Sequence, residues 1–121
     1  LVFPRCAAIV HHGGAGTTHA AARAGKPQVV VANISEQEHW AGELRHLGVA
    51  GRLARRRSVT AAGLAKHIRE VLASNAMAVR AQALGAAMAG EDGVAQAVRL
   101  IGERFDALLA GKSAVPDARQ A

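Results

Sequence analysis

A glycine-rich turn between two short apolar runs constrains the fold of this chain more than any other feature. The first run, residues 6–10 (CAAIV), and the second, residues 28–31 (QVVV), are typical of buried strands in a parallel sheet. Between them, residues 17–24 are rich in alanine and predict a short helix that ends at Gly25. A strand, a helix and a second strand in this order form a crossover with parallel strands. We therefore expect an α/β fold.

The next segment continues this alternation. Ser35 and Glu38 have the spacing of a capping box, which predicts a helix with Ser35 as its N-cap. Residues 49–53 (VAGRL) predict a short edge strand, and Thr60 is placed to cap a further helix. The expected architecture is a Rossmann-like parallel sheet with flanking helices.

The last third of the chain shows only helical periodicity. Glu91 and Asp92 open the last of its helices, where acidic residues suit the helix dipole. The periodicity ends near Gly111. We therefore assign residues 1–110 to one domain and expect a flexible tail at residues 111–121.

Composition excludes several classes of protein. The 121 residues suffice for one modest domain, and 50% hydrophobic against 20% charged residues argues against disorder. No apolar run approaches the roughly 18 residues that a membrane span needs. The single cysteine, Cys6, excludes a disulfide framework and favours a reducing, cytoplasmic setting. We expect no integral membrane segment.

The net charge of +6 raises the question of a nucleic-acid partner. The positive charge is densest in residues 52–57 (RLARRR), between two expected elements. No aromatic residue is interleaved with these arginines to stack on bases. A solvated basic loop is the simpler interpretation, and we expect no nucleic-acid binding.

Residues 11–18 (HHGGAGTT) are the strongest candidate for a binding site. Glycines at this strand-to-helix junction leave room for a ligand close to the main chain, and the free N–H groups of a helix start attract anions. Thr17 and Thr18 add hydroxyl groups, and His12 adds a hydrogen-bond donor. The pattern suggests a cradle for a phosphate or diphosphate. A glycine-rich turn with a structural role, with His12 bonded to the backbone, stays open as the alternative.

Three better-known kinds of site do not fit these residues. Gly25-Lys26 is followed by Pro27, which excludes a P-loop. The dinucleotide fingerprint fails because His19 stands where its third glycine should be. A metal site that joins His11 and His12 is disfavoured since neighbouring strand residues point to opposite faces. We expect no metal.

Glu36 and Gln37 form a second candidate. They fall in the first turn of the helix that follows the second strand, at the sheet edge where ligands bind in open α/β folds. A carboxylate and an amide suit a polyhydroxylated ligand. The alternative is a helix start in which Glu36 complements the dipole and Gln37 is solvated.

Four segments together carry a resemblance to a known family: residues 3–8 (FPRCAA), the turn at 11–18, residues 24–28 (AGKPQ), and Glu36-Gln37 followed by Trp40-Ala41. Residues 1–50 resemble the C-terminal domain of family 1 glycosyltransferases. The likeness is greatest to the bacterial and fungal branch that acts on sterols, macrolides and glycopeptides. The resemblance implies part of the C-terminal domain of a GT-B fold.

The resemblance also implies roles for individual residues. His12, Gly14, Gly16, Thr17 and Thr18 take the positions that bind the donor diphosphate. Glu36 and Gln37 take those that bind the transferred sugar, although Glu36 replaces the usual aspartate. The implied reaction transfers a hexosyl group, with inversion, from a UDP-sugar or TDP-sugar to a hydroxyl of a lipophilic acceptor. No metal or other cofactor is implied.

The family's general base and its base-stacking aromatic residue have no counterpart in this chain. Leu1 is not a methionine, and the first strand begins within a few residues, so the chain looks like a fragment. We therefore expect no catalytic residue here and no activity from the isolated chain. A stand-alone module that binds a nucleotide or nucleotide sugar without catalysis is the alternative.

Overall fold

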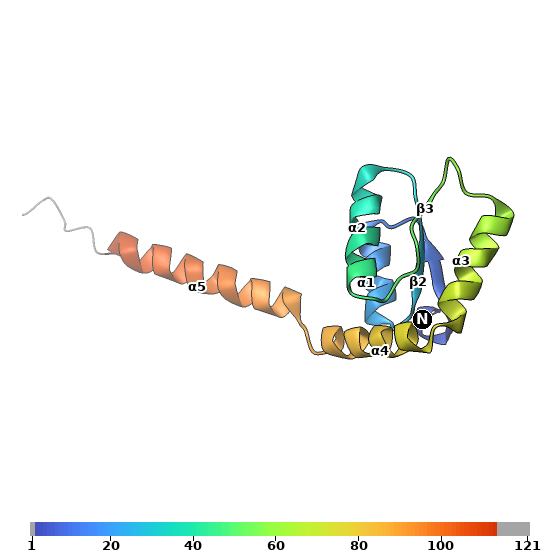
Figure 1. Ribbon diagram of the computed structural model, residues 1–121. Helices are drawn as coiled ribbons and strands as arrows, with labels where there is room; N and C mark the ends of the chain where they lie inside the picture. The colour runs from blue at the N-terminus through green and yellow to red at the C-terminus, as the bar shows by residue number, and fades with distance from the viewer. Residues whose placement is uncertain (1, 114–121) are drawn as a thin grey trace, which may run out of the picture. The chain divides into compact units, whose positions relative to one another are not determined.

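The computed structural model describes residues 2–113. It confirms an α/β fold with a three-stranded parallel sheet in the order β1-β2-β3 (Figure 1). The elements, in chain order, are η1 (Phe3–Arg5), β1 (Ile9–His11), α1 (Ala15–Arg23), β2 (Gln28–Ala32), α2 (Ser35–His46), β3 (Ala54–Arg55), α3 (Ala61–Ala73), α4 (Asn75–Ala89) and α5 (Gly93–Ser113).

The central strand β2 sets the register of the sheet. Val10 of β1 lies opposite Val29, and Val31 lies opposite Ala54 of β3. Helices α1 and α2 cover one face of the sheet, and α3 covers the other (Figure 1). Because the strands are parallel, the turns that follow β1 and β2 leave the sheet at the same edge. Both candidate binding stretches lie in those turns.

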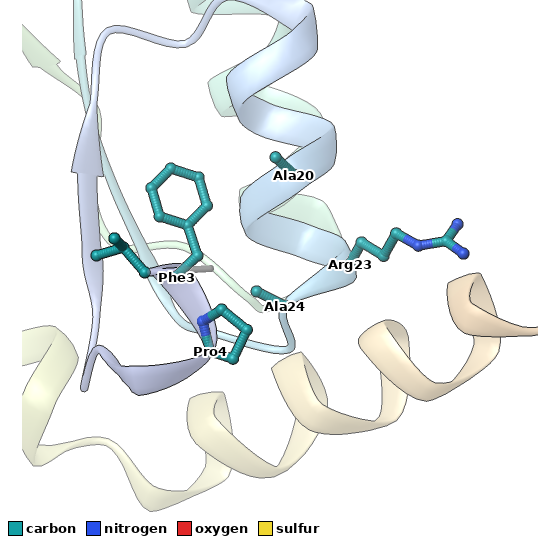
Figure 2. A pocket seen from close by; sticks show the side chains of 6 residues that line it. Phe3, Pro4, Ala20, Arg23 and Ala24 are labelled. Atoms are coloured by element: carbon teal, nitrogen blue, oxygen red, sulfur yellow. The ribbon is translucent and has the colours of Figure 1, made fainter.

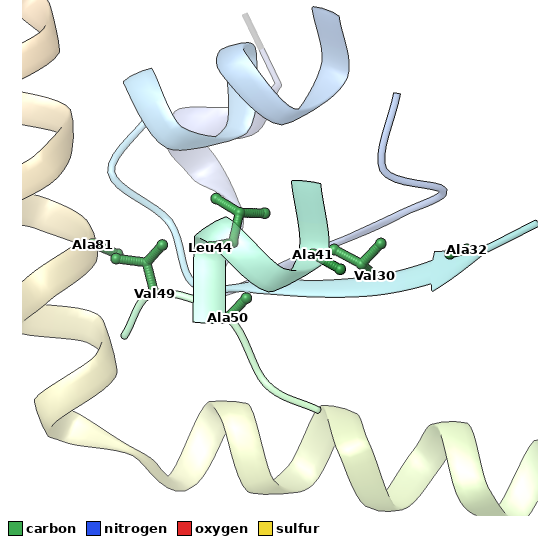
Figure 3. Close-up of a cluster of buried hydrophobic side chains, with 7 residues drawn as sticks. All are labelled: Val30, Ala32, Ala41, Leu44, Val49, Ala50 and Ala81. Carbon is green, nitrogen blue, oxygen red and sulfur yellow. The ribbon is translucent and has the colours of Figure 1, made fainter. Parts of the chain in front are cut away.

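The core is built from small aliphatic side chains, as the scarcity of aromatic residues requires. Its main cluster joins β2, α2, the segment after α2, and α4 (Figure 3). Its buried members are Val30, Ala32, Ala41, Leu44, Val49, Ala50 and Ala81. Small residues also let α4 approach the turn after α1 closely: a Cβ on Gly85 of α4 would lie 2.7 Å from the Cα of Gly25. Such contacts leave little space for larger side chains.

The expected edge strand at residues 49–53 is wrong in position. Only Ala50 forms a bridge, to Gln28, and the ladder resumes at β3. Gly51 lies between them, where a Cβ would come within 2.6 Å of Val71 Cγ2 on α3. Close packing of the backbone against α3 therefore accompanies the interrupted strand.

The structure divides into two units, Leu1–Gly90 and Glu91–Ala121, and α5 belongs to the second. The Asp92 carboxylate accepts a hydrogen bond from the Ala95 N–H and so caps this helix. Helix α5 extends through Ser113, beyond the expected domain end at residue 110. The rest of the expected tail, residues 114–121, lies outside the described residues. No helix within residues 2–113 is both long and apolar enough to cross a bilayer.

Candidate functional site

The turn after β1 is held by Gly13. Gly13 is buried and has a φ of +92°, a conformation that side chains other than glycine rarely adopt. A Cβ at this position would lie 2.8 Å from Val30 Cγ1 and 3.0 Å from the carbonyl oxygen of Gln37. The glycine thus lets the first candidate stretch approach the second.

His11 fixes this turn from inside the fold. Its Nδ1 accepts a hydrogen bond from the Gly13 N–H at 3.0 Å, and its Nε2 lies 2.7 Å from the Oε1 of buried Gln28. Since Nδ1 is an acceptor, the neutral ring carries its proton on Nε2, and this N–H donates a hydrogen bond to Gln28. Burial lowers the pKa of His11, and the charge of His12 adds to this effect, while the bond to Gln28 opposes it.

Both ring nitrogens of His11 are therefore occupied, which leaves none for a metal ion. No group of three or more potential metal ligands occurs among residues 2–113. Sequence reasoning missed the pairing of His11 with Gln28. The available signal was a glutamine at the start of an otherwise apolar, β-branched strand, a polar group that needs a partner when buried.

His12 is exposed, whereas His11 is half-buried. Its ring lies over Gly14, where a Cβ would come within 2.5 Å of Nε2. Gly14 is the N-cap of α1, and its carbonyl accepts the Thr18 N–H at 2.9 Å. The N–H groups of the three residues between them have no partner within the helix. The imidazole and these N–H groups thus lie at the same helix start, as an anion site requires.

Gly16 and Thr17 are accessible at this helix start, but Thr18 is not. A Cβ on Gly16 would meet nothing within 4 Å, so the space around it is open. Thr18 is only 3% exposed, and its hydroxyl is buried without a hydrogen-bond partner. Its N–H is already bonded to Gly14. The structure therefore brings His12, Gly14, Gly16 and Thr17 together and places Thr18 beneath them.

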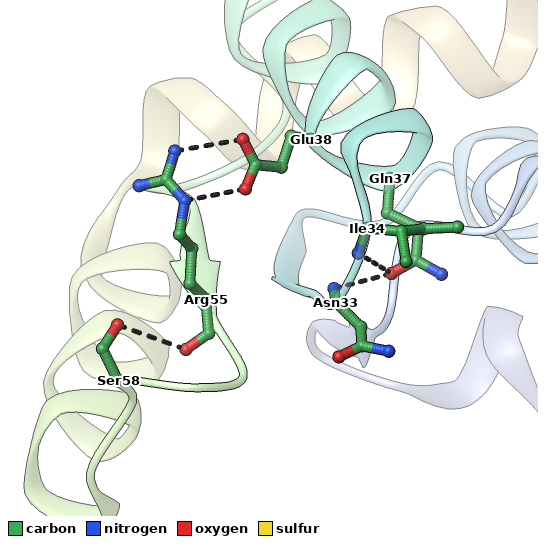
Figure 4. Close-up of polar contacts among 6 residues, drawn as sticks. All are labelled: Asn33, Ile34, Gln37, Glu38, Arg55 and Ser58. Atoms are coloured by element: carbon green, nitrogen blue, oxygen red, sulfur yellow. Dashed lines mark hydrogen bonds and ion pairs between the residues drawn. The ribbon is translucent and has the colours of Figure 1, made fainter.

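The turn after β2 differs from the expected capping box. The N-cap of α2 is Ile34, not Ser35. Gln37 reaches back instead, and its Oε1 accepts the N–H of Asn33 at 2.7 Å and that of Ile34 at 3.4 Å (Figure 4). An isoleucine side chain cannot accept a hydrogen bond, so the Gln37 amide provides the capping bonds.

Glu38 does not cap the helix because it pairs with Arg55 on β3. The two carboxylate oxygens lie 2.7 and 3.0 Å from the guanidinium nitrogens (Figure 4). This bond and the positive charge lower the pKa of Glu38. Glu36 remains exposed in the first turn of α2, and Gln37 keeps its NH₂ group as a donor.

A separate apolar pocket of about 540 Å³ lies between η1 and α1 (Figure 2). It is lined by Val2, Phe3, Pro4, Ala20, Arg23 and Ala24. It includes none of the candidate residues of the two turns. The candidate site is therefore formed by the two turns and not by this pocket.

Several known proteins are similar to this chain in sequence or in fold. Residues 1–102 match the family model described as erythromycin biosynthesis protein CIII-like, C-terminal domain. The O-mycaminosyltylonolide 6-deoxyallosyltransferase of Streptomyces fradiae is 46% identical over 102 residues, which are 84% of this chain and 24% of that protein. The sterol 3-beta-glucosyltransferase of Eremothecium gossypii is 34% identical over 119 residues, 98% of this chain and 9% of that protein.

A solved structure of the kitacinnamycin glycotransferase matches with a TM-score of 0.75 and 27% identity, covering 84% of this chain and 26% of that one. This likeness supports the expected relation to the GT-B fold. The chain spans about a quarter or less of the length of each of these proteins. The match over residues 1–102 shows that the chain belongs to the erythromycin biosynthesis protein CIII-like C-terminal domain family of glycosyltransferases.

Proposed function

We propose that this chain is the donor-binding part of a glycosyltransferase. It binds a nucleoside diphosphate sugar, with UDP as the nucleotide and a hexose as the sugar. The observation that carries the proposal is the approach of the two turns: Gly13 brings the anion-attracting start of α1 against Gln37 at the start of α2. One turn suits a diphosphate, and its neighbour offers a carboxylate and an amide to sugar hydroxyls.

In this proposal the diphosphate lies at the helix start of α1. The N–H groups near Gly14 and Gly16 and the hydroxyl of Thr17 donate hydrogen bonds to it. His12 donates a further bond and stabilises the charge that builds on the leaving diphosphate. Thr18 supports the turn from below, since its N–H is bonded to Gly14 and its side chain is buried.

Glu36 accepts and Gln37 donates hydrogen bonds to the hydroxyls of the transferred sugar. The hexosyl group passes with inversion to the hydroxyl of a lipophilic acceptor. In this proposal the candidate residues all contact the donor, and the base that removes the acceptor's proton is not one of them. We also propose that this hexosyl transfer takes place in the cytoplasm.

Two glycine-to-alanine variants test the diphosphate site. A methyl group at Gly16 has open space in the fold, as it has at Gly42 in α2. Both variants should fold at least as stably as the wild type since alanine favours a helix. We expect Gly16→Ala to weaken UDP-glucose binding at least about tenfold by calorimetry, because it crowds the phosphate and costs hydrogen bonds to a charged group. Gly42→Ala should bind as the wild type does.

Equal binding by Gly16→Ala and the wild type would contradict the diphosphate site. In the complete enzyme, His12→Ala should lower transfer by roughly 10²-fold, as expected when one donor to developing charge is lost. Binding of UDP-glucose by the complete protein without any sugar transfer or donor hydrolysis would favour the non-catalytic module instead. Replacing UDP-glucose with TDP-glucose distinguishes the two nucleotides.

A further inference from the structure

Three consecutive arginines lie at the end of β3, next to the turn after β2, which is the second turn of the proposed donor site. Arg55 is the last residue of the strand, and Arg56 and Arg57 begin the turn that leads to α3. The backbone holds this turn in place: the Arg56 N–H donates to the Ala32 carbonyl at 2.9 Å, and the Ser58 N–H donates to the Arg55 carbonyl at 3.0 Å. Residues 55–58, called the arginine turn below, are thus fixed against the end of β2.

A polar pocket of about 290 Å³ lies between the arginine turn and the start of α2. The residues that line it with polar side chains are Asn33, Glu38, Arg55, Arg56, Arg57 and Ser58. None of them is aromatic, so the pocket offers no surface on which a base could stack.

The charges of the pocket do not balance. Its one carboxylate, Glu38, is paired with Arg55. Neither Arg56 nor Arg57 forms an ion pair with a carboxylate within residues 2–113. The guanidinium groups of Arg56 and Arg57 therefore have no carboxylate partner. Each guanidinium group carries only N–H donors, and its planar fork matches the two oxygens of a carboxylate or a phosphate.

The pocket adjoins the residues proposed to bind the sugar. Asn33, in its wall, donates its backbone N–H to the Gln37 side chain at 2.7 Å (Figure 4). Glu38, also in its wall, is the next residue after Gln37. Asn33 therefore belongs to both the second turn and the pocket, and a substrate that extends from the second turn past Asn33 would reach the unpaired arginines.

We propose that this pocket is a subsite for an acidic group, a carboxylate or a phosphate, carried by a substrate of the transferase. The inference rests on the proposed function for the identity of that substrate. Arg56 and Arg57 bind the group, and Arg55 is held in place by Glu38. A donor sugar with a carboxylate and an acceptor with an acidic group share this chemistry.

The test compares two double variants with the same change in charge. Arg56→Gln/Arg57→Gln removes the unpaired arginines of the pocket. Arg52→Gln/Arg69→Gln removes two exposed arginines that do not line it. Inorganic phosphate is titrated into each ¹⁵N-labelled chain, and the amide shifts of Asn33 and Ser58 report on the pocket. The shifts of Gly14 and Gly16 report on the proposed diphosphate site.

We expect saturable shifts at Asn33 and Ser58 in the wild type and in the control variant. In Arg56→Gln/Arg57→Gln the affinity should fall about tenfold or more, because hydrogen bonds to a charged group are lost. The absence of these shifts in the wild type, or an equal loss in both double variants, would overturn the subsite. Shifts absent only at Gly14 and Gly16 would instead count against the proposed diphosphate site.

A second titration identifies which substrate carries the acidic group. If it is the donor sugar, UDP-glucuronate should bind about tenfold more tightly than UDP-glucose, and the preference should disappear in Arg56→Gln/Arg57→Gln. Equal affinities, with phosphate still bound in the pocket, would support the subsite and assign the acidic group to the acceptor.

Discussion

The two turns of the candidate site leave adjacent parallel strands, but they are held in different ways. The turn after β1 is fixed from inside: Gly13 is buried, and His11 joins its backbone to buried Gln28. The turn after β2 is fixed near the surface, by the Gln37 side chain and by the ion pair of Glu38 with Arg55. One depends on close packing and the other on solvent-accessible polar contacts.

The difference indicates how a domain of this kind can vary. Buried polar contacts and a glycine with positive φ tolerate few replacements, because each change leaves an unpaired group or a clash. Surface contacts are worth less and are more easily exchanged. The proposed diphosphate turn should therefore be intolerant of change, and the proposed sugar turn should accept substitutions that alter which sugar fits. Four predictions test this contrast.

Gly13→Ala should have the largest effect. The substitution forces a side chain into a positive φ and places its Cβ 2.8 Å from Val30 Cγ1. Backbone strain and overpacking together should lower the free energy of unfolding by roughly 2–5 kcal/mol. Urea denaturation followed by circular dichroism measures it.

The matched control for this variant is Gly42→Ala on the exposed face of α2. Its Cβ meets no atom within 4 Å, so the fold should gain up to about 1 kcal/mol from the better helix former. If Gly13→Ala matched Gly42→Ala in stability, the first turn would not depend on glycine. The contrast between the two turns would then lose its main support.

Lowering the pH should destabilise the turn after β1, because His11 becomes protonated. Its pKa is lower in the folded protein than the ordinary value of 6.5. The unfolded chain therefore takes up a proton first as the pH falls below about 6.5, and the contribution of His11 to stability is lost as the pH passes through the folded pKa. Protonation also removes the Nδ1 acceptor of the Gly13 N–H.

The measurement is the difference in unfolding free energy between pH 7.5 and pH 5.5. We expect the wild type to lose more stability over this interval than His11→Asn, whose side chain does not titrate. The other histidines are present in both proteins, and His12, whose charge acts on His11, contributes less to the shift in the pKa of His11 than burial does. The same loss in both proteins would mean that His11 does not couple the turn to pH.

Much of the first turn could be predicted from sequence, because local signals specify it. The run HHGGAGTT after an apolar strand indicated a glycine turn and a helix start, and the structure has both. The partners of His11 and Thr18 could not be predicted. The His11 contact joins residues 17 positions apart, and the burial of Thr18 depends on packing that no local pattern describes.

The second turn was less predictable, since several local arrangements compete there. Ser35 with Glu38 and Ile34 with Gln37 have the same spacing, and only the first has the residue types of a capping box. The structure uses Gln37 because Glu38 has a better partner in Arg55, which follows 17 residues later. The position of β3 was also missed: the strand starts only after Gly51, whose backbone packs closely against Val71 on α3.

Two variants of Gln37 separate its capping bonds from its proposed contact with the sugar. Gln37→Ala removes the acceptor for the Asn33 and Ile34 N–H groups and should cost about 1 kcal/mol of stability. Gln37→Glu keeps an acceptor and should stay near the wild type. Both lack the NH₂ donor, so both should bind UDP-glucose more weakly than the wild type. Full binding by Gln37→Glu would remove the amide from the sugar site.

Glu38→Gln should have the smallest effect, because its ion pair with Arg55 is exposed to solvent. The loss of stability should be small at neutral pH and low salt, and it should shrink further in 1 M salt, since ions screen exposed charges. Arg55 holds the pKa of Glu38 below its ordinary 4.5, so the stabilising effect is present at neutral pH and is lost as the pH falls through the folded pKa. Denaturation midpoints of the wild type and the variant should therefore converge in acid. A large, salt-independent loss would show that the second turn depends on this contact as strongly as the first depends on Gly13, and that surface bonds alone do not explain its structure.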